Sequence, residues 1–466
     1  MLAQTAEEGI GPIATALQKK EFEKALDLVR PALRVSPGNA QLWAMEGAAY
    51  SGEGYKKEAL ASFLHALKIS PDYLPALEGA VQIEFDQGNP AAILLLQHLL
   101  RLRPNDSTSH GMLAVLEYQQ GNCAASIEQF EKAGSIFDSK PSALHANAIC
   151  LVKLKQFDRA AAIFRRVIAL EPDDGHERLL LAAIQIMGRH QGDALATLEP
   201  LMQTSSPDAQ TLELASAAYE ADKDTERAVS TLRQAILLDP HNVNLYRDFA
   251  AVCYEHGSFQ VGIDIVSDGL GLEPGAAPLY FARGALYVQL SQYDKAEADF
   301  QKAYELDPSQ SLSVAAQGIA AAQQHDFDRA LKTVQASLAR KPKDPLMLYL
   351  QADILANNNA DPSSRDFQLA VASARKAVAL QPALGAAHGV LGKLYLEAGR
   401  FPEAIEECRK AIANDPADQA SVYHLIQGLR KAGNKNEIPE LLKRLATLRE
   451  QALQKDRERY RYKLVD

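Results

Sequence analysis

The sequence predicts an all-α protein built from a tandem array of antiparallel helix pairs, and three observations lead to this fold class. Proline recurs at intervals of 34 residues, for example from Pro37 to Pro71 and from Pro382 to Pro416. Between successive prolines, apolar residues recur at i, i+4 and i+7, which is the spacing of one face of a helix. A short turn divides each interval into two such segments. Helix pairs that repeat in this way bury their apolar faces only against their neighbours, as in a solenoid.

The segment between Pro37 and Pro71 shows how one unit is organised. The pattern predicts a first helix over residues 41–50, a glycine-containing turn over 51–55 and a second helix over 57–67. Small and bulky residues alternate on the faces that meet, namely Trp43, Gly47, Tyr50, Ala59, Phe63 and Ala66. We expect the small residues to let the two helices approach closely, while the bulky ones fill the space beside them. Proline ends the unit because it cannot continue a helix.

This pattern resembles the tetratricopeptide repeat, whose units carry a bulky residue, glycine or alanine, and tyrosine in the first helix, and alanine, an aromatic residue, alanine and proline after it. Two units match at every position: Trp43, Gly47, Tyr50, Ala59, Phe63, Ala66 and Pro71, and Tyr280, Gly284, Tyr287, Ala296, Phe300, Ala303 and Pro308. A third near-complete unit ends at Pro416, with Cys408 where an aromatic residue is usual. In the unit that ends at Pro274, Gly262 and Gly269 replace alanine, which predicts looser helix pairing there.

The resemblance covers nearly the whole chain and implies a right-handed α-α superhelix. We expect about thirteen units over residues 1–436, with a longer unit near 345–382, followed by a C-terminal capping helix and charged tail over 437–466. The extra length of that unit falls in the sequence NNNADPSSRD, residues 357–366, which predicts a protruding turn.

Composition excludes several classes of protein. The 466 residues are 47% hydrophobic, which is too apolar for a mostly disordered chain. A net charge of −10 argues against a general nucleic-acid binder, and no apolar run approaches the length of a membrane span. The N-terminus shows no signal peptide, so a cytoplasmic location is favoured, and a periplasmic one requires that a leader was removed or omitted.

The sequence offers little chemistry for catalysis or metal binding. The four cysteines, Cys123, Cys150, Cys253 and Cys408, form no CxxC motif, so we expect buried free thiols rather than disulfides or a zinc site. The enzyme motifs GxxxxGK[ST], HExxH and GxSxG are missing, and His325 falls in an inter-helix turn. The repeats leave no stretch of about 100 residues for a second core. We therefore expect neither an enzyme nor a cofactor or metal.

The resemblance implies where a partner would bind. The first helices of such an array line a concave face, and positions 2, 5, 9, 12 and 13 of each point into it. Applied to this chain, those positions predict a partner-binding set of Phe85, Tyr118, His145, Lys153, Arg247, Tyr254, Phe281, Tyr349, Lys393, Tyr423 and Arg430. Aromatic residues and arginine are common interface anchors. The alternative is that several of these side chains pack between neighbouring repeats.

These expectations lead to a function. The favoured one is a non-enzymatic scaffold that holds a peptide or protein segment in the concave groove. The alternative is an accessory or regulatory subunit of an enzyme, or of a cell-envelope, secretion or glycosyl-transfer machine. A hydrolase or transferase with an unrecognised site is a third and weaker reading.

The C-terminal segment carries a leucine stripe followed by charges. Leu441, Leu445 and Leu448 are spaced to cover the end of the last repeat. From Lys443 onward, eight basic residues face four acidic ones, which allows a nucleic-acid or anionic-membrane patch. A solvated capping helix is favoured, because Asp456 can pair with Arg459 at i+3 and weaken the positive field.

Overall fold

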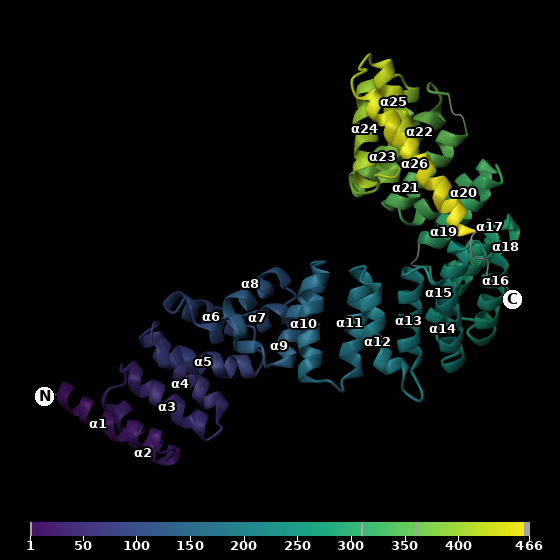
Figure 1. Cartoon of the computed structure of the whole chain (residues 1–466). Helices are drawn as coiled ribbons and strands as arrows, with labels where there is room; N and C mark the ends of the chain where they lie inside the picture. Colours follow the sequence, from purple (N-terminus) through teal and green to yellow (C-terminus); the bar gives the residue numbers. More distant parts are fainter. Residues whose placement is uncertain (1, 309–310, 359–360, 461–466) are drawn as a thin grey trace. The chain divides into compact units, whose positions relative to one another are not determined.

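The computed structural model describes residues 2–308, 311–358 and 361–460 (Figure 1). Over these residues the regular secondary structure comprises 26 α-helices and one 3-10 helix, with no strand. The all-α prediction is therefore confirmed. Each odd-numbered helix packs against the even-numbered helix that follows it, so the helices form antiparallel pairs.

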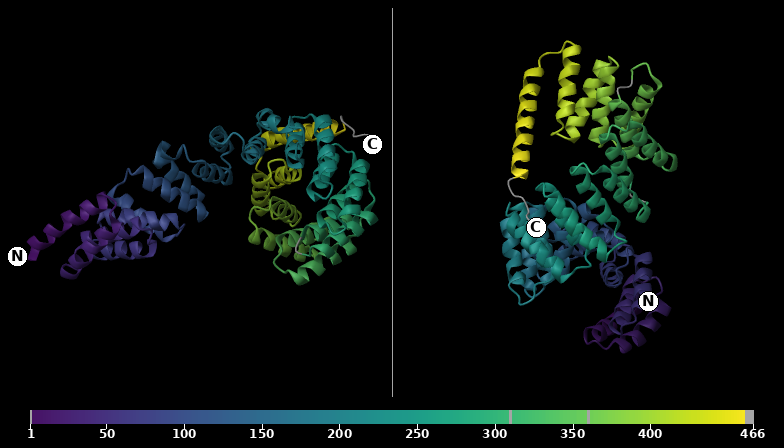
Figure 2. Two further views of the ribbon diagram at one scale, coloured as in Figure 1. Left: turned by 90° about the horizontal axis from the view of Figure 1, so that it is seen from below. Right: turned by 90° about the vertical axis from the view of Figure 1, so that its right-hand side faces the viewer.

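The chain divides into two compact units, and within each unit the helix pairs stack side by side (Figure 2). Unit 1 ends at Ser206. Its helices are α1 (Leu2–Gln18), α2 (Phe22–Val35), α3 (Ala40–Gly52), α4 (Lys56–Ile69), α5 (Leu74–Asp86), α6 (Ala91–Leu102), α7 (Ser107–Gln119), α8 (Cys123–Ala133), η1 (Gly134–Phe137), α9 (Pro141–Lys153), α10 (Phe157–Leu170), α11 (Gly175–Met187) and α12 (Gln191–Met202).

Unit 2 begins at Pro207. Its helices are α13 (Ala209–Ala221), α14 (Thr225–Leu238), α15 (Val243–Glu255), α16 (Phe259–Leu272), α17 (Ala277–Gln289), α18 (Tyr293–Leu306), α19 (Ser311–Gln323), α20 (Phe327–Arg340), α21 (Pro345–Asn357), α22 (Arg365–Leu380), α23 (Gly385–Glu397), α24 (Phe401–Asn414), α25 (Gln419–Lys431) and α26 (Ile438–Arg459).

The turn inside most helix pairs contains one residue with a left-handed backbone. Glycine occupies this place in several repeats, as at Gly54 (φ +83°) and Gly399 (φ +73°). In other repeats a residue other than glycine has the left-handed backbone, as at Lys155 (φ +58°) and His325 (φ +59°). Left-handed geometry costs about 1 kcal/mol or more outside glycine, so packing of the two helices imposes this turn on those residues.

The recurring proline also joins neighbouring repeats. The Trp43 indole Nε1 donates to the carbonyl oxygen of Pro37 at 2.8 Å, and the Tyr246 hydroxyl donates to that of Pro240 at the same distance. In each case the donor lies six residues beyond the proline, in the first helix of the next pair. The bulky residue of the repeat pattern therefore satisfies a carbonyl that the preceding turn leaves free.

Small residues permit close helix packing, as the sequence predicts. The Phe63 ring of α4 lies where side-chain atoms on Gly47 and Gly79 would stand, and a Cβ on Gly47 would come within 2.8 Å of it. One aromatic ring thus fills the space between α3, α4 and α5. Ala59 and Ala66, on the same helix as Phe63, are fully buried.

The expectation of loose pairing around Gly262 and Gly269 is wrong. A Cβ on Gly269 would come within 2.8 Å of the buried Tyr246 ring, and a Cβ on Gly262 would come within 2.8 Å of the Cys253 side chain. Larger neighbouring side chains fill the space that alanine would take. The α15–α16 pair is therefore closely packed.

The expectation of four free thiols is also wrong for two of them. Cys123 at the start of α8 and Cys150 near the end of α9 form a disulfide, with Cα atoms 4.8 Å apart. Adjacent helices that run antiparallel bring the start of one beside the end of the other, which a sequence separation of 27 does not reveal. Cys253 and Cys408 are buried free thiols, as expected.

The long unit places its extra residues between α21 and α22, where Ser364 caps α22 by accepting from the Phe367 amide at 3.1 Å. Residues 359 and 360 of the predicted protruding turn lie outside the described residues.

At the end of the chain, α26 packs Ile438 and Leu445 into a cluster with Leu425 and Leu429 of α25. The first half of α26 therefore covers the last repeat.

Candidate functional site

In both units, first helices of several successive pairs contact one another and share a face made of odd-numbered helices. In unit 2, α21 contacts α23 and α23 contacts α25, and in unit 1, α1, α3 and α5 do the same. We call this face the first-helix surface. All eleven side chains that the sequence predicts for partner binding belong to odd-numbered helices.

In unit 1, most of these predicted side chains pack between repeats. Phe85 and Tyr118 are half-buried against apolar clusters. His145 Nδ1 lies 2.8 Å from Glu177 Oε1, and its ring stands edge-on to Phe164. Lys153, at the end of α9, is exposed. The alternative of inter-repeat packing thus describes the aromatic members of this group.

In unit 2, the predicted residues divide differently. Phe281 is half-buried, with its ring centre 5.6 Å from that of Phe300. Tyr349 is also half-buried, and this burial raises its pKa to about 12. Four of the predicted side chains are exposed, namely Arg247, Tyr254, Tyr423 and Arg430. Tyr423 is 44% exposed, and Tyr254 is 37% exposed with the Arg459 guanidinium 5.1 Å from its ring centre. This part of the first-helix surface keeps both aromatic and cationic groups accessible.

A cluster of ionisable groups lies across α21, α23 and α25. We define this polar cluster as Asp353, Lys393, Glu397 and His424. The Lys393 ammonium donates to the backbone carbonyl of Ala356 at 3.2 Å and to the side chain of Asn357 at 2.9 Å. Partial burial removes solvent from these groups, so their interactions are stronger than at an open surface.

Burial and one cation explain how the polar cluster titrates. Burial raises the pKa of the Asp353 and Glu397 carboxyls, and the Lys393 ammonium opposes this shift in both. Burial lowers the pKa of His424, and Lys393 lowers it further. Perturbed titration of several neighbouring groups is typical of functional sites, although structural ion-pair networks share it.

Sequence reasoning found Lys393 but missed its acidic neighbours. Asp353 and Glu397 occupy positions 9 and 13 of their repeats, the same positions that yielded Lys393 and Lys153. These repeat positions therefore also indicate Asp353 and Glu397, but the predicted partner-binding set included only the aromatic and basic residues at such positions. His424 stands at position 6, outside the positions used.

A second pair of acidic side chains lies on α13 and α15. Burial raises the pKa of Glu213, and the neighbouring Asp248 raises it further. Arg247 Nη2 lies 3.5 Å from Asp248 Oδ1 and opposes that shift. The first-helix surface of unit 2 thus carries two partly desolvated acidic sites, each with one basic partner.

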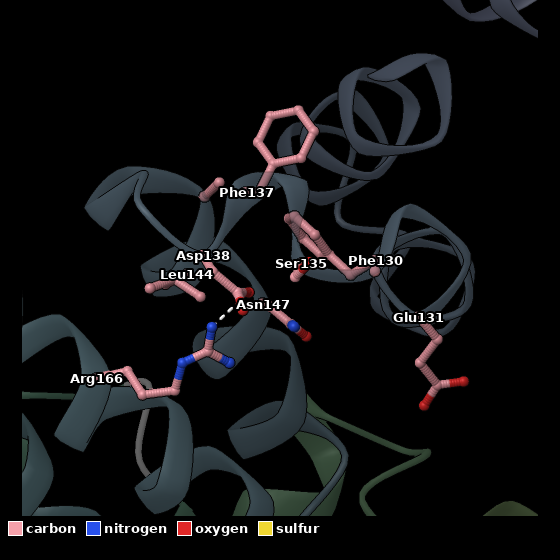
Figure 3. Close-up of a pocket in the computed structure, with 10 residues that line it drawn as sticks. Phe130, Glu131, Ser135, Phe137, Asp138, Leu144, Asn147 and Arg166 are labelled. Carbon is pink, nitrogen blue, oxygen red and sulfur yellow. Dashed lines mark ion pairs between the residues drawn. The ribbon is translucent and has the colours of Figure 1, made fainter. Parts of the chain in front are cut away.

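Unit 1 contains a small pocket beside the 3-10 helix η1 (Figure 3). Its volume is about 270 Å³, and Arg166 forms an ion pair with Asp138 at its rim. Phe130 and Leu144 supply apolar walls, and Asn147 points its side chain into the same region (Figure 3). This volume lies below the usual range of small-molecule sites, so we do not assign it as the functional site.

The described residues hold no group of three or more His, Cys, Asp or Glu side chains that could bind a metal ion. Burial raises the pKa of both free thiols, Cys253 and Cys408, to about 12, so neither supplies a thiolate nucleophile at neutral pH. Across the same part of the chain, no helix has the length and apolar character to cross a membrane.

Comparison with known families identifies the class of protein that this architecture defines. Models of the tetratricopeptide repeat match residues 40–73, 148–174, 209–242, 277–310, 315–364 and 363–419. Together these matches extend over half of the chain. The chain belongs to the tetratricopeptide repeat family, and its fold is that of a protein–protein interaction scaffold.

Two curated relatives are similar over long segments. Superkiller protein 3 of Schizosaccharomyces pombe is 25% identical over 290 residues, which are 58% of this chain and 20% of that protein. The CTR9 homologue of Arabidopsis thaliana is 20% identical over 426 residues, which are 87% of this chain and 35% of that protein. The aligned part of the chain thus spans only about a fifth to a third of these relatives.

Among solved structures, the crystal structure of yeast Tom70 is 20% identical and aligns over 98% of this chain and 96% of its own, with a TM-score of 0.48. A structure of Naa15/Naa10 bound to HypK-THB is 15% identical and aligns over 97% of this chain and 77% of its own, with a TM-score of 0.40.

Proposed function

We propose that this chain is a non-enzymatic scaffold that binds a peptide or protein segment along the first-helix surface of unit 2, with the polar cluster as its anchor. The observation that carries this proposal is the position of Lys393 between the helices that bear Asp353 and His424. The exposed Tyr423 has its ring centre 5.8 Å from that of His424.

The physical basis is the combination of partial desolvation with open aromatic surface. Charged groups that are already half-buried lose little further hydration when a partner covers them, and charge-assisted hydrogen bonds strengthen as water leaves. Tyr423 supplies apolar area with few rotatable bonds, which lowers the entropy cost of binding. Tyrosine and arginine are enriched at protein interfaces, and Tyr423 and Arg430 of α25 supply exposed side chains of both kinds.

The test is affinity purification of the tagged chain from its native cells, followed by mass spectrometry, with the Tyr423→Ala variant in parallel. We expect this variant to capture less of the main partner while its circular dichroism stays unchanged, because Tyr423 is exposed. Tyr55→Ala is the matched control, since Tyr55 is 55% exposed but precedes α4, outside the first-helix surface. Equal capture by both variants and the unchanged chain would place the partner elsewhere.

The same purification addresses the alternative of an accessory or regulatory subunit. If an enzyme is recovered in equal amounts with the chain, and its activity changes when the chain is removed, the scaffold is a subunit of that enzyme or machine. A catalytic activity that remains in the purified chain alone would contradict the non-enzymatic proposal.

A further inference from the structure

The far end of α26 contacts helices that precede it by about 200 residues. Arg459 donates from Nη2 and Nε to the backbone carbonyl oxygen of Tyr254, at 2.8 and 3.2 Å. The same guanidinium lies 5.1 Å from the ring centre of Tyr254 and 5.3 Å from that of Phe259. All three residues belong to unit 2. Arg459 is therefore held by two aromatic faces and one carbonyl.

The surface that receives Arg459 is predominantly acidic. A pocket of about 790 Å³ lies where the turns of the α13–α14 and α15–α16 pairs meet the end of α26. The repeats contribute five carboxylates to its lining, Glu220, Asp222, Asp224, Glu226 and Glu255, and one lysine, Lys223. From the other side, α26 contributes Lys455, Glu458 and Arg459, and Lys455 Nζ lies 4.0 Å from Glu255 Oε2. The repeat side is therefore strongly acidic, and the α26 side carries a small excess of positive charge.

The end of α15 is suited to a cation for a second reason. Tyr254 is the last but one residue of this helix, where backbone carbonyls lack partners within the helix. The helix dipole adds partial negative charge at the same place. Arg459 thus supplies hydrogen-bond donors and positive charge to a C-terminal helix end, between aromatic rings that attract a cation.

Only the tip of α26 makes this contact. From residue 449 to 458 every side chain is exposed, including Leu453 at 61%, whereas Arg459 is half-buried. Tyr460 also reaches the receiving turn, since a Cβ on Gly257 would come within 2.7 Å of its ring. The helix is therefore anchored by the last repeat at one end and by a few polar contacts at the other.

We propose that Tyr254, Phe259 and the acidic turns beside them form a recognition site for an arginine carried by a basic helical segment, and that the chain's own Arg459 is bound there as a latch. The latch joins the last repeat of unit 2 to the α15–α16 pair. Its few exposed polar contacts can open and close without unfolding the repeats. The site is separate from the polar cluster that anchors the proposed function, and its test does not require a partner protein.

The experiment measures latch closure in the full chain with two spin labels, at Gln451→Cys on α26 and Ser230→Cys on α14, both exposed positions. The native cysteines do not take up label, because two are buried and two form a disulfide. We expect a narrow distance distribution that becomes broader and longer in Arg459→Ala and in 1 M salt, where the screening length is about 3 Å.

Arg457→Ala is the matched control, since it removes the same charge two residues away on an exposed side chain. We expect it to leave the distance distribution unchanged. If Arg459→Ala does not alter the distribution, or if Arg457→Ala opens it equally, the latch is not held by Arg459 and the proposal fails.

A second measurement tests the pocket itself. A peptide with the sequence of residues 449–460 should bind the Arg459→Ala chain roughly tenfold more tightly than the unchanged chain, in which Arg459 already covers Tyr254 and Phe259. The same peptide with alanine in place of its arginine at 459 should lose this binding. Equal binding of the peptide to both chains, or binding to neither, would overturn the assignment of the site.

Discussion

The Phe300 ring occupies the space that a side chain on Gly284 would need, so that a Cβ there would lie 2.6 Å from a ring carbon. Gly284 is in α17 and Phe300 in α18, and both are buried. The two helices can approach closely because Gly284 has no side chain and the Phe300 ring fills the space beside it. The same relationship joins Gly47 and Phe63 in unit 1.

This packing predicts that Gly284→Ala destabilises unit 2, although alanine is the better helix former. The methyl group would displace the Phe300 ring at a cost of about 1–3 kcal/mol, against a propensity gain of about 1 kcal/mol. Urea denaturation should show a lower midpoint. The control is Gly271→Ala in α16, where a Cβ meets no atom within 4 Å, and stability should stay equal or rise.

Where a residue other than glycine has the left-handed backbone of the turn, we expect substitution by glycine to stabilise the protein. Lys155 has φ +58°, so Lys155→Gly should raise the free energy of unfolding of unit 1 by about 1 kcal/mol through relief of backbone strain. Lys155→Ala removes the same side chain but keeps the strain, and we expect little change from it. Thermal denaturation compares the two, and equal effects would show that the backbone is not strained.

The disulfide predicts a redox-dependent stability of unit 1. It joins Cys123 and Cys150 across a sequence separation of 27, which contributes about 3–4 kcal/mol in the chain-entropy treatment. Dithiothreitol should lower the melting temperature of the unchanged chain. The Cys123→Ser, Cys150→Ser double variant should melt lower in oxidising buffer and show no response to dithiothreitol. A response in that variant would point to another cause.

His424 predicts a loss of stability in mild acid. Its pKa is lowered by burial, so the unfolded chain takes up a proton near the ordinary value of about 6.5 while the folded chain stays neutral. The stabilising contribution is therefore complete above that pH and is lost as pH falls toward the lowered pKa. In His424→Gln, the fall in free energy of unfolding between pH 7 and 5 should be smaller.

As pH falls, the neighbouring carboxyls change the stability in the opposite direction to His424. The contribution of His424 is therefore measured by comparing the unchanged chain with His424→Gln. Asp353 and Glu397 have raised pKa values, so the folded chain binds their protons first and gains stability as pH falls below those values. If His424→Gln and the unchanged chain show the same slope above pH 5, His424 is not the group responsible.

The repeat architecture could be predicted from the sequence because its determinants are local. The spacing of Trp43, Gly47, Tyr50 and Phe63 defines a helix pair within 34 residues, and the recurrence of that spacing defines the array. For the candidate site, the sequence placed the predicted residues on the first helices of the pairs, and that is where they lie in the structure. It did not distinguish the packed Phe281 and Tyr349 from the exposed Tyr254 and Tyr423, because exposure depends on how the next repeat is rotated.

The sequence by itself determined the class of this protein, since helical periodicity and the close packing of small against bulky residues act over one or two repeats. Only the tertiary structure decided which residues meet across longer distances. Cys123 and Cys150 pair because α8 and α9 run antiparallel. Arg459 contacts Tyr254, 205 residues earlier, rather than its helix neighbour Asp456. Small rotations that accumulate from repeat to repeat set such contacts, and no single repeat encodes their sum.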